Sequence, residues 1–170
     1  LLSYTRKAID DYQMIQEGDK IAVGVSGGKD SITLALALKG LQRFYPKHFE
    51  LMAFTVSLGF PNFDTSRLEA FMAEHEIPYS VISTDIGPIV FEERKEESPC
   101  SLCSKMRKGA LNEFAKANGC NKIALGHHMD DILETLLMNI TYQGAFSTMP
   151  PRLMMKKFDM TIIRPMCLVH

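Results

Sequence analysis

Short apolar runs alternate with longer amphipathic stretches along this chain, and this alternation limits its fold more than any other feature. We expect strands at 21–25, 51–56, 79–84, 122–125 and 161–164, with helices between them at 31–45, 64–74, 100–118 and 130–142. Continuous apolar strands that alternate with helices are typical of a mostly parallel sheet with helices on both faces. The sequence therefore predicts a doubly wound α/β fold.

The ends of the predicted helices carry residues suited to stopping or starting a helix. Pro46 would end the first, Asp64 would cap the second, and Gly119 suits the left-handed position after the third. The charged run 92–97 is predicted to be an exposed loop. With 170 residues, 46% of them hydrophobic, the chain is large enough for one domain with a core and too small for two. We therefore predict a single domain over 1–170.

The composition and the termini of the chain bear on its cellular location and on whether it is a fragment. The longest apolar run, 32–38, is too short for a membrane span, and no signal-peptide pattern opens the chain. We therefore expect a cytoplasmic protein without membrane contact. Because the chain begins at Leu1 rather than Met and stops at His170, just after a strand-like run, we expect a fragment truncated at its C-terminus.

Total charge does not indicate a nucleic-acid-binding protein, because the net charge is −1. Five basic residues nevertheless lie between positions 104 and 122, against one acid: Lys105, Arg107, Lys108, Lys116 and Lys122. From charge alone, a solvated helix face is the better interpretation of this run.

The loop that joins the first predicted strand to its helix has the composition of a phosphate-binding loop. Its residues are Ser26, Gly27, Gly28, Lys29, Asp30 and Ser31. The two glycines allow a tight turn and a close approach to an anion, which the free N–H groups of the helix start would face. The hydroxyls and the lysine add donors and a positive charge. An acid beside phosphate needs a cation, so Asp30 predicts Mg²⁺.

This loop is not a Walker A sequence, because Asp30 follows Lys29 where that pattern requires Ser or Thr. A plain strand-to-helix turn would need only the two glycines. The polar residues at the remaining positions argue against that simpler interpretation.

A second polar loop, Gly126 to Asp131, follows the fourth predicted strand. Ligands of doubly wound sheets bind at the carboxyl ends of strands where the strand order reverses. If the first and fourth strands are neighbours there, both loops open into one crevice. Two His and two Asp residues in the loop would also suit a metal, and Asp130 would suit the cap of the next helix while Asp131 works in the site.

Cys100 and Cys103 lie three residues apart at the start of a predicted helix, so both thiols can point the same way. The helix N-terminus and the basic residues that follow would favour the thiolate forms. Half a zinc site, a redox pair and part of an iron–sulfur site all remain open. A four-cysteine zinc site would also need Cys120 and Cys167, which we interpret instead as buried packing residues.

Three motifs together carry a resemblance to a known family. The loop 26–31, S-G-G-K-D-S, resembles the signature of the PP-loop ATPases, which cleave ATP between its α and β phosphates. The loop 126–131 is similar to the second nucleotide motif, G-H-x-x-D-D, of the sulfur-inserting members. With P-C-S-L-C-S-K-M-R-K-G-A-L at 99–111, these motifs closely resemble the tRNA 2-thiocytidine synthetase family over most of the chain.

That resemblance implies an adenine nucleotide alpha hydrolase-like fold and an ATP-dependent tRNA sulfurtransferase. Such an enzyme adenylates a base carbonyl, here expected at C2 of a cytidine, and replaces its oxygen with sulfur, releasing AMP and pyrophosphate. The implied cofactors are ATP, Mg²⁺ and a [4Fe–4S] cluster held by three cysteines. The implied partners are tRNA and a sulfur donor such as a cysteine desulfurase, with a homodimer as the assembly to consider.

The resemblance also implies roles for individual residues. Cys100 and Cys103 match the first two cluster ligands, and the third would lie beyond residue 170. Arg107 and Asp131 match catalytic positions. The positions implied to bind the nucleotide are those of the loop 26–31, together with Val56, Gly126 and His128. The segment 56–59, V-S-L-G, departs from the acidic L-D-Q type of the family, so the adenine pocket or the substrate side is expected to differ.

Two rival hypotheses remain. A tRNA-amidating or lysidine-type ligase would use the same adenylation but would not need Cys100 and Cys103. A non-catalytic redox or zinc module would use the cysteine pair alone and would leave the S-G-G-K-D-S loop without a role.

Overall fold

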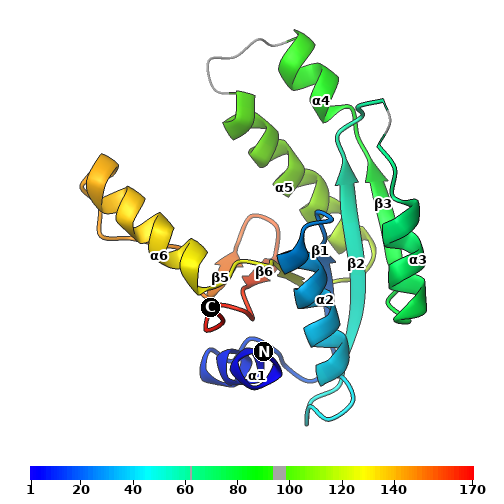
Figure 1. Cartoon of the computed structure of the whole chain (residues 1–170), viewed down its shortest axis with the longest axis vertical. Helices are drawn as coiled ribbons and strands as arrows, with labels where there is room; N and C mark the ends of the chain where they lie inside the picture. Colours follow the sequence, from blue (N-terminus) through cyan, green and yellow to red (C-terminus); the bar gives the residue numbers. More distant parts are fainter. Residues whose placement is uncertain (62, 94–98) are drawn as a thin grey trace.

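The centre of the molecule is a six-stranded sheet with the strand order β3-β2-β1-β4-β6-β5, shown in Figure 1. This computed structural model describes residues 1–61, 63–93 and 99–170. The strands are β1 (Asp19–Gly24), β2 (Phe49–Ser57), β3 (Tyr79–Ser83), β4 (Lys122–Ala124), β5 (Arg152–Met155) and β6 (Met160–Ile163). The pairings are parallel except for that of β5 with β6, which is antiparallel.

Helices cover both faces of this sheet. They are α1 (Leu2–Asp11), α2 (Lys29–Leu41), α3 (Ser66–Glu74), α4 (Ile86–Pro88), α5 (Pro99–Ala117) and α6 (Met129–Met138), with the π-helical segments η1 (Ile89–Glu93) and η2 (Asn139–Gln143). Side chains alternate along β1: Ile21 and Val23 pack into the core formed with α1, α2 and α3, whereas Ala22 packs into the core formed with α5. The predicted doubly wound α/β class is confirmed.

Helix boundaries differ from the sequence-based predictions where local hydrogen bonds override the pattern. α2 ends at Leu41 rather than at 45, because the N–H groups of Arg43 and Phe44 bond three residues back. Asp64 lies one residue before the N-cap of α3, although its carboxylate still accepts the N–H of Ser66 at 2.9 Å. Of the predicted loop 92–97, residues 92 and 93 belong to η1 and the rest lie outside the described residues.

Four of the described elements were not predicted: α1, α4, η1 and the edge strand β5. α1 buries a narrow stripe consisting of Thr5, Ala8 and Ile9. Three of the four residues of β5 are exposed, so this strand lacks the alternation of buried apolar and exposed polar residues from which a strand is predicted.

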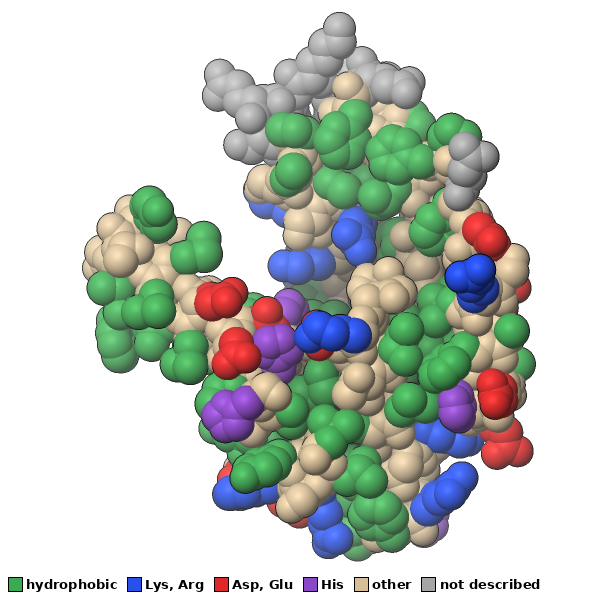
Figure 2. Space-filling view, in the orientation of Figure 1, with side chains coloured by type: hydrophobic (Ala, Val, Ile, Leu, Met, Phe, Trp, Pro, Cys, Tyr) green, Lys and Arg blue, Asp and Glu red, His purple; other side chains and the backbone are tan. Residues whose placement is uncertain are grey.

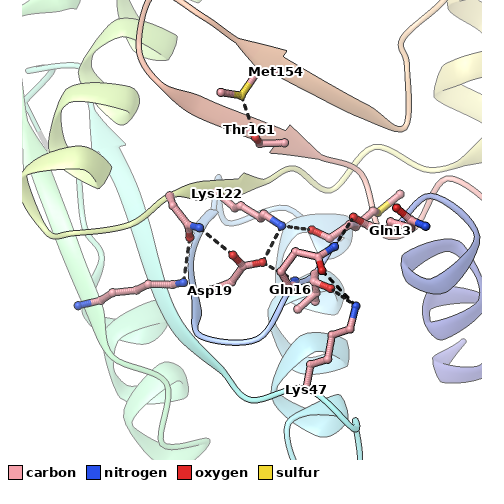
Figure 3. A network of polar contacts seen from close by, with 11 residues as sticks. Gln13, Gln16, Asp19, Lys47, Lys122, Met154 and Thr161 are labelled. Carbon is pink, nitrogen blue, oxygen red and sulfur yellow. Dashed lines mark hydrogen bonds and ion pairs between the residues drawn. The ribbon is translucent and has the colours of Figure 1, made fainter.

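A buried polar network joins the N-terminal ends of the neighbouring strands β1 and β4, as Figure 3 shows. The Nζ atom of Lys122 lies 2.6 Å from the Asp19 carboxylate, and both side chains are almost fully buried. Lys122 also donates to the carbonyl of Met14, and Asn121 donates to Asp19. Burial acts to raise the pKa of Asp19, but the hydrogen bonds from Gln16, Lys122 and Asn121 together lower it. The sequence-based assignment of Lys122 to a solvated basic face is therefore wrong.

α6 projects away from the sheet with the segment that follows it (Figure 1). Every residue of α6 is at least partly exposed. Large apolar side chains lie open along α6 and beyond it, as Figure 2 shows: Leu133, Leu137, Met138, Ile140, Tyr142 and Phe146. Among the helices described, none combines the length and the apolar character that crossing a bilayer requires.

Candidate active site

The two polar loops share one crevice. β1 and β4 are parallel neighbours, with Val23 opposite Ala124, so the loops that follow them leave the same edge of the sheet. Between these loops and α5 lies a cavity of about 370 Å³. Its lining includes Ser26, Asp30 and Ser31 from the first loop, Gly126, His127 and Asp131 from the second, and Val56 from β2. The condition for a shared crevice, that the first and fourth predicted strands are neighbours, is met, and both loops line one cavity as predicted.

The first loop is held in shape by its own polar groups. Gly27 has a φ of +83°, a conformation that strongly favours glycine. The Ser31 hydroxyl donates to the carbonyl of Gly28 at 2.9 Å and accepts the N–H of Ser26 at 3.2 Å. Thr55 of β2 supports the loop from behind by donating to the carbonyl of Val25 at 2.8 Å. This loop therefore has a defined backbone shape at the N-terminus of α2.

Gly126 allows the second loop to lie directly against the start of α2. A Cβ atom built on Gly126 would be 3.1 Å from the carbonyl carbon of Asp30 and from the N and Cα atoms of Ser31. All three neighbours are backbone atoms, which cannot rotate away. A side chain at this position would therefore push the two loops apart.

Lys29 and Asp30 form an exposed ion pair at the mouth of the crevice, with Nζ 2.9 Å from the carboxylate. The hydrogen bond to Asp30 raises the pKa of Lys29, and the charges of Asp131 and Asp130 add to this. The same hydrogen bond lowers the pKa of Asp30. Asp30 lines the cavity, whereas Lys29, Gly27 and Gly28 lie outside its lining.

Asp131 lines the cavity as predicted, but it also takes the capping role that was predicted for Asp130. His128 occupies the N-cap position, and its N–H donates to the Asp131 carboxylate at 2.8 Å. Asp131 therefore caps the helix while it also lines the cavity, and Asp130 is exposed.

The histidine that lines the cavity is not the one that was predicted to bind the nucleotide. His127, rather than His128, lines the cavity. The ring of His128 instead lies beside the two acids, with Nδ1 3.8 Å from the carboxylate of Asp130 and Nε2 3.6 Å from that of Asp131.

Arg164, which was not assigned a role from the sequence, fixes the tautomer and favours the neutral form of the His127 imidazole. Its buried guanidinium donates to the carbonyl of Pro150 at 2.6 Å and to Nδ1 of His127 at 3.3 Å. Since a guanidinium only donates, Nδ1 must accept, which leaves the proton of the neutral imidazole on Nε2. Burial, and then the charge of Arg164, lower the pKa of His127 and favour this neutral form. The feature that could have indicated a site role for Arg164 is its position directly after β6, the strand that pairs with β4.

One face of α5 forms the opposite wall of the cavity. Ser104, Arg107, Lys108 and Leu111 line it, at the i, i+3, i+4, i+7 spacing of a single helix face. Arg107 was predicted to belong to the site, while Ser104 and Lys108 were missed although the helical spacing indicates them. Figure 2 shows basic side chains beside the hollow between α5 and α6. Part of the basic run therefore faces the site rather than open solvent.

The cysteine pair begins the same helix. Cys100 is exposed, whereas Cys103 is buried against Ile86 of α4 and Val90 of η1. Two thiols one helical turn apart suit two ligands of a metal cluster. Among the described residues, no group of three or more His, Cys, Asp or Glu side chains is arranged to hold a metal ion. Cys100 and Cys103 could therefore supply two ligands of such a cluster, and no third His, Cys, Asp or Glu joins them among the described residues.

Cys120 and Cys167 are packing residues, as predicted. They lie in two different cores, Cys120 with α5 and Cys167 with α1 and α2. Burial raises the pKa of both thiols, which disfavours the thiolate form that binds metal. The four-cysteine zinc site is therefore excluded.

Comparison with known proteins agrees with this fold. Residues 2–170 match the family described as the PP-loop domain, and the chain belongs to this family. It is 44% identical over 171 residues to a tRNA-cytidine(32) 2-sulfurtransferase of Legionella pneumophila (strain Paris), covering 100% of this chain and 60% of that protein. It is 42% identical to the enzyme of the same name from Geobacter metallireducens, covering 96% of this chain and 64% of that protein.

A solved structure is similar over nearly the whole chain. It is the U34-tRNA thiolase NcsA from Methanococcus maripaludis with its [4Fe–4S] cluster, with a TM-score of 0.74 and 25% sequence identity. The match covers 99% of this chain and 58% of that one. The chain thus spans about 60% of the length of the first curated relative.

Proposed function

We propose that this chain is the ATP-binding and sulfur-transfer domain of an ATP-dependent tRNA sulfurtransferase that acts at C2 of a cytidine. One observation carries the proposal: a single cavity is lined by the phosphate-type loop, by the second loop, and by Arg107, which lies one helical turn after Cys103. The names of the relatives and of the solved thiolase support tRNA as the substrate.

In the first step, the phosphates of ATP lie against the loop 26–31 and the N-terminus of α2, with adenine beside Val56. The base oxygen attacks the α-phosphate, the bond between the α and β phosphates breaks, and pyrophosphate leaves while held by the loop. Asp30, which is ionised and lines the cavity, would hold Mg²⁺.

The cationic side chains of α5 and the neutral His127 stabilise the charge that develops on the phosphates. Arg107 and Lys108 line the cavity opposite the loops, and His127 offers its Nε2–H from the second loop. Donors held in place before the reaction stabilise a transition state without reorganising. Asp131 holds the backbone of His128, the residue next to His127, through its cap of α6.

In the second step, sulfur replaces the activated oxygen, the C–O bond breaks, and AMP leaves with the former base oxygen. Cys100 and Cys103 would supply two thiolates to a [4Fe–4S] cluster, and the third protein ligand would come from outside residues 1–170. When bound, such a cluster supplies sulfide through its open iron. The cysteine desulfurase as sulfur donor, the homodimer and the cytoplasmic location stay predictions.

The test is anaerobic reconstitution of the longer protein, which extends beyond residues 1–170, followed by mass spectrometry of tRNA nucleosides. The wild-type enzyme should form 2-thiocytidine together with AMP and pyrophosphate, and its visible spectrum should show cluster absorption. Cys103→Ala should lose both the thiolated product and the absorption while its ATP affinity stays unchanged. If Cys103→Ala still thiolates tRNA at the normal rate, the sulfur-transfer role is wrong. ATP use without thiolation by the wild type would favour the ligase hypothesis.

A further inference from the structure

A second hollow, of about 140 Å³, opens beside the nucleotide cavity. It shares Ser26, Val56 and Arg107 with that cavity, so the two adjoin. The rest of its wall comes from Thr55 of β2 and from the segment after β2, where Leu58, Phe60 and Phe63 line it. Leu58 belongs to 56–59, the segment in which the sequence departs from the related family.

Two exposed aromatic rings distinguish this hollow from the rest of the site. Phe60 and Phe63 are 45% and 48% exposed. The ring of Phe60 rests on backbone, because a Cβ atom built on Gly87 would come within 2.7 Å of its Cζ atom. The ring of Phe91 lies beside it, with ring centroids 6.0 Å apart. Phe60 is therefore a supported ring whose free face is open to a ligand.

The hollow lies between the two chemical centres of the proposed reaction. Ser26 belongs to the phosphate-type loop, while Val56 and Leu58 pack against the cluster of apolar residues that contains Cys103. Arg107 reaches the hollow from α5, one turn after Cys103. A base that must meet both the α-phosphate and a sulfur atom held near Cys103 has to occupy a position between them.

We propose that this hollow is the subsite for the unpaired pyrimidine base of the tRNA substrate, stacked on Phe60 and Phe63 beside Arg107. The inference rests on the proposed function. Proteins commonly read single-stranded bases by stacking them on aromatic side chains and on arginine planes. The guanidinium of Arg107 would also offer donors to the base carbonyl.

The adenine of ATP is the rival occupant, and the geometry favours the larger cavity for it. That cavity already has an apolar wall formed by Phe54, Leu111 and Leu125. The smaller hollow, of about 140 Å³ against about 370 Å³, better matches a single pyrimidine ring.

The test uses two ligands and three variants of the cluster-loaded enzyme. An anticodon stem-loop RNA carries fluorescent pyrrolocytosine in place of the target cytidine, and a fluorescent ATP analogue reports the nucleotide site. Phe60→Ala removes the ring, and Phe60→Tyr keeps it. Phe44→Ala is the matched control, because Phe44 is also exposed, at 52%, but follows the far end of α2, roughly 20 Å from the loop.

We expect Phe60→Ala to weaken stem-loop binding by about tenfold, the effect of losing one base–aromatic stack. The fluorescence change of the pyrrolocytosine should disappear as well. Phe60→Tyr and Phe44→Ala should bind both ligands like the wild type, and Phe60→Ala should bind the ATP analogue normally.

Each other result overturns the inference in a distinguishable way. If the wild type thiolates tRNA and Phe60→Ala binds the stem-loop equally well, the subsite is wrong and the proposed function stands. If Phe60→Ala weakens only the ATP analogue, adenine occupies the hollow. If the wild type neither binds the stem-loop nor thiolates tRNA, the proposed function and the subsite both fail.

Discussion

Replacing Gly126 with alanine tests whether the close contact of the two loops builds the site. The added Cβ atom would meet three backbone atoms of Asp30 and Ser31 at 3.1 Å. Favourable carbon contacts lie at about 3.5–4.0 Å, so each neighbour would have to retreat by several tenths of an ångström. These atoms belong to the first turn of α2 and cannot move one by one, so the whole loop that carries Gly126 must move away from α2. Overpacking of this kind costs about 1–3 kcal/mol of folding free energy.

Gly109→Ala is the matched control for this change. Gly109 lies inside α5, and a Cβ atom there meets nothing within 4 Å. Alanine should therefore stabilise the protein by about 0.5–1 kcal/mol through the lower backbone entropy of the unfolded chain.

Urea denaturation and ATP titration measure both variants. Gly126→Ala should unfold at lower urea concentration and bind ATP more weakly, because the displaced loop carries His127 and Asp131. Gly109→Ala should unfold at higher urea concentration. If Gly126→Ala matched the wild type in both assays, the close approach of the loops would not be what holds the site together.

Three further changes probe separate parts of the structure. Lys122→Met leaves the buried Asp19 carboxylate without its ion-pair partner and should lower the free energy of unfolding in urea at pH 7 by about 3–5 kcal/mol. Since the folded pKa of Asp19 is lowered in the wild type, its contribution to stability is present above about pH 4 and is lost as pH falls through the folded pKa. A variant whose stability depends on acid pH as the wild type's does would contradict the assignment. Arg164→Met frees Nδ1 of His127, and ¹⁵N NMR should show the proton redistributing between the two ring nitrogens and the pKa of His127 rising; an unchanged tautomer would refute the arginine's positioning role. Asp30→Ala should abolish Mg²⁺-dependent pyrophosphate release with an unchanged urea midpoint, and release at the wild-type rate would exclude Asp30 as the metal ligand.

Local patterns were enough to predict the fold class and the loops that carry the chemistry. Continuous apolar runs and period-3.6 apolar patterns arise within a few residues, so β1 and α5 were found close to their true positions. The glycines of the first loop and the cysteine pair are equally local features. The left-handed Gly119, with a φ of +75°, was also foreseen, because the left-handed position after a helix end favours glycine.

Tertiary structure decided which side chains meet. β1 and β4 lie about a hundred residues apart in the chain, and their pairing both buries Lys122 on Asp19 and brings Gly126 onto α2. The direction of a side chain in a loop has no sequence period, which is why His127 rather than His128 faces the cavity. Arg164 reaches His127 only because β6 pairs with β4. Sequence patterns report which surface a residue prefers, whereas contacts between distant segments depend on how the whole sheet packs.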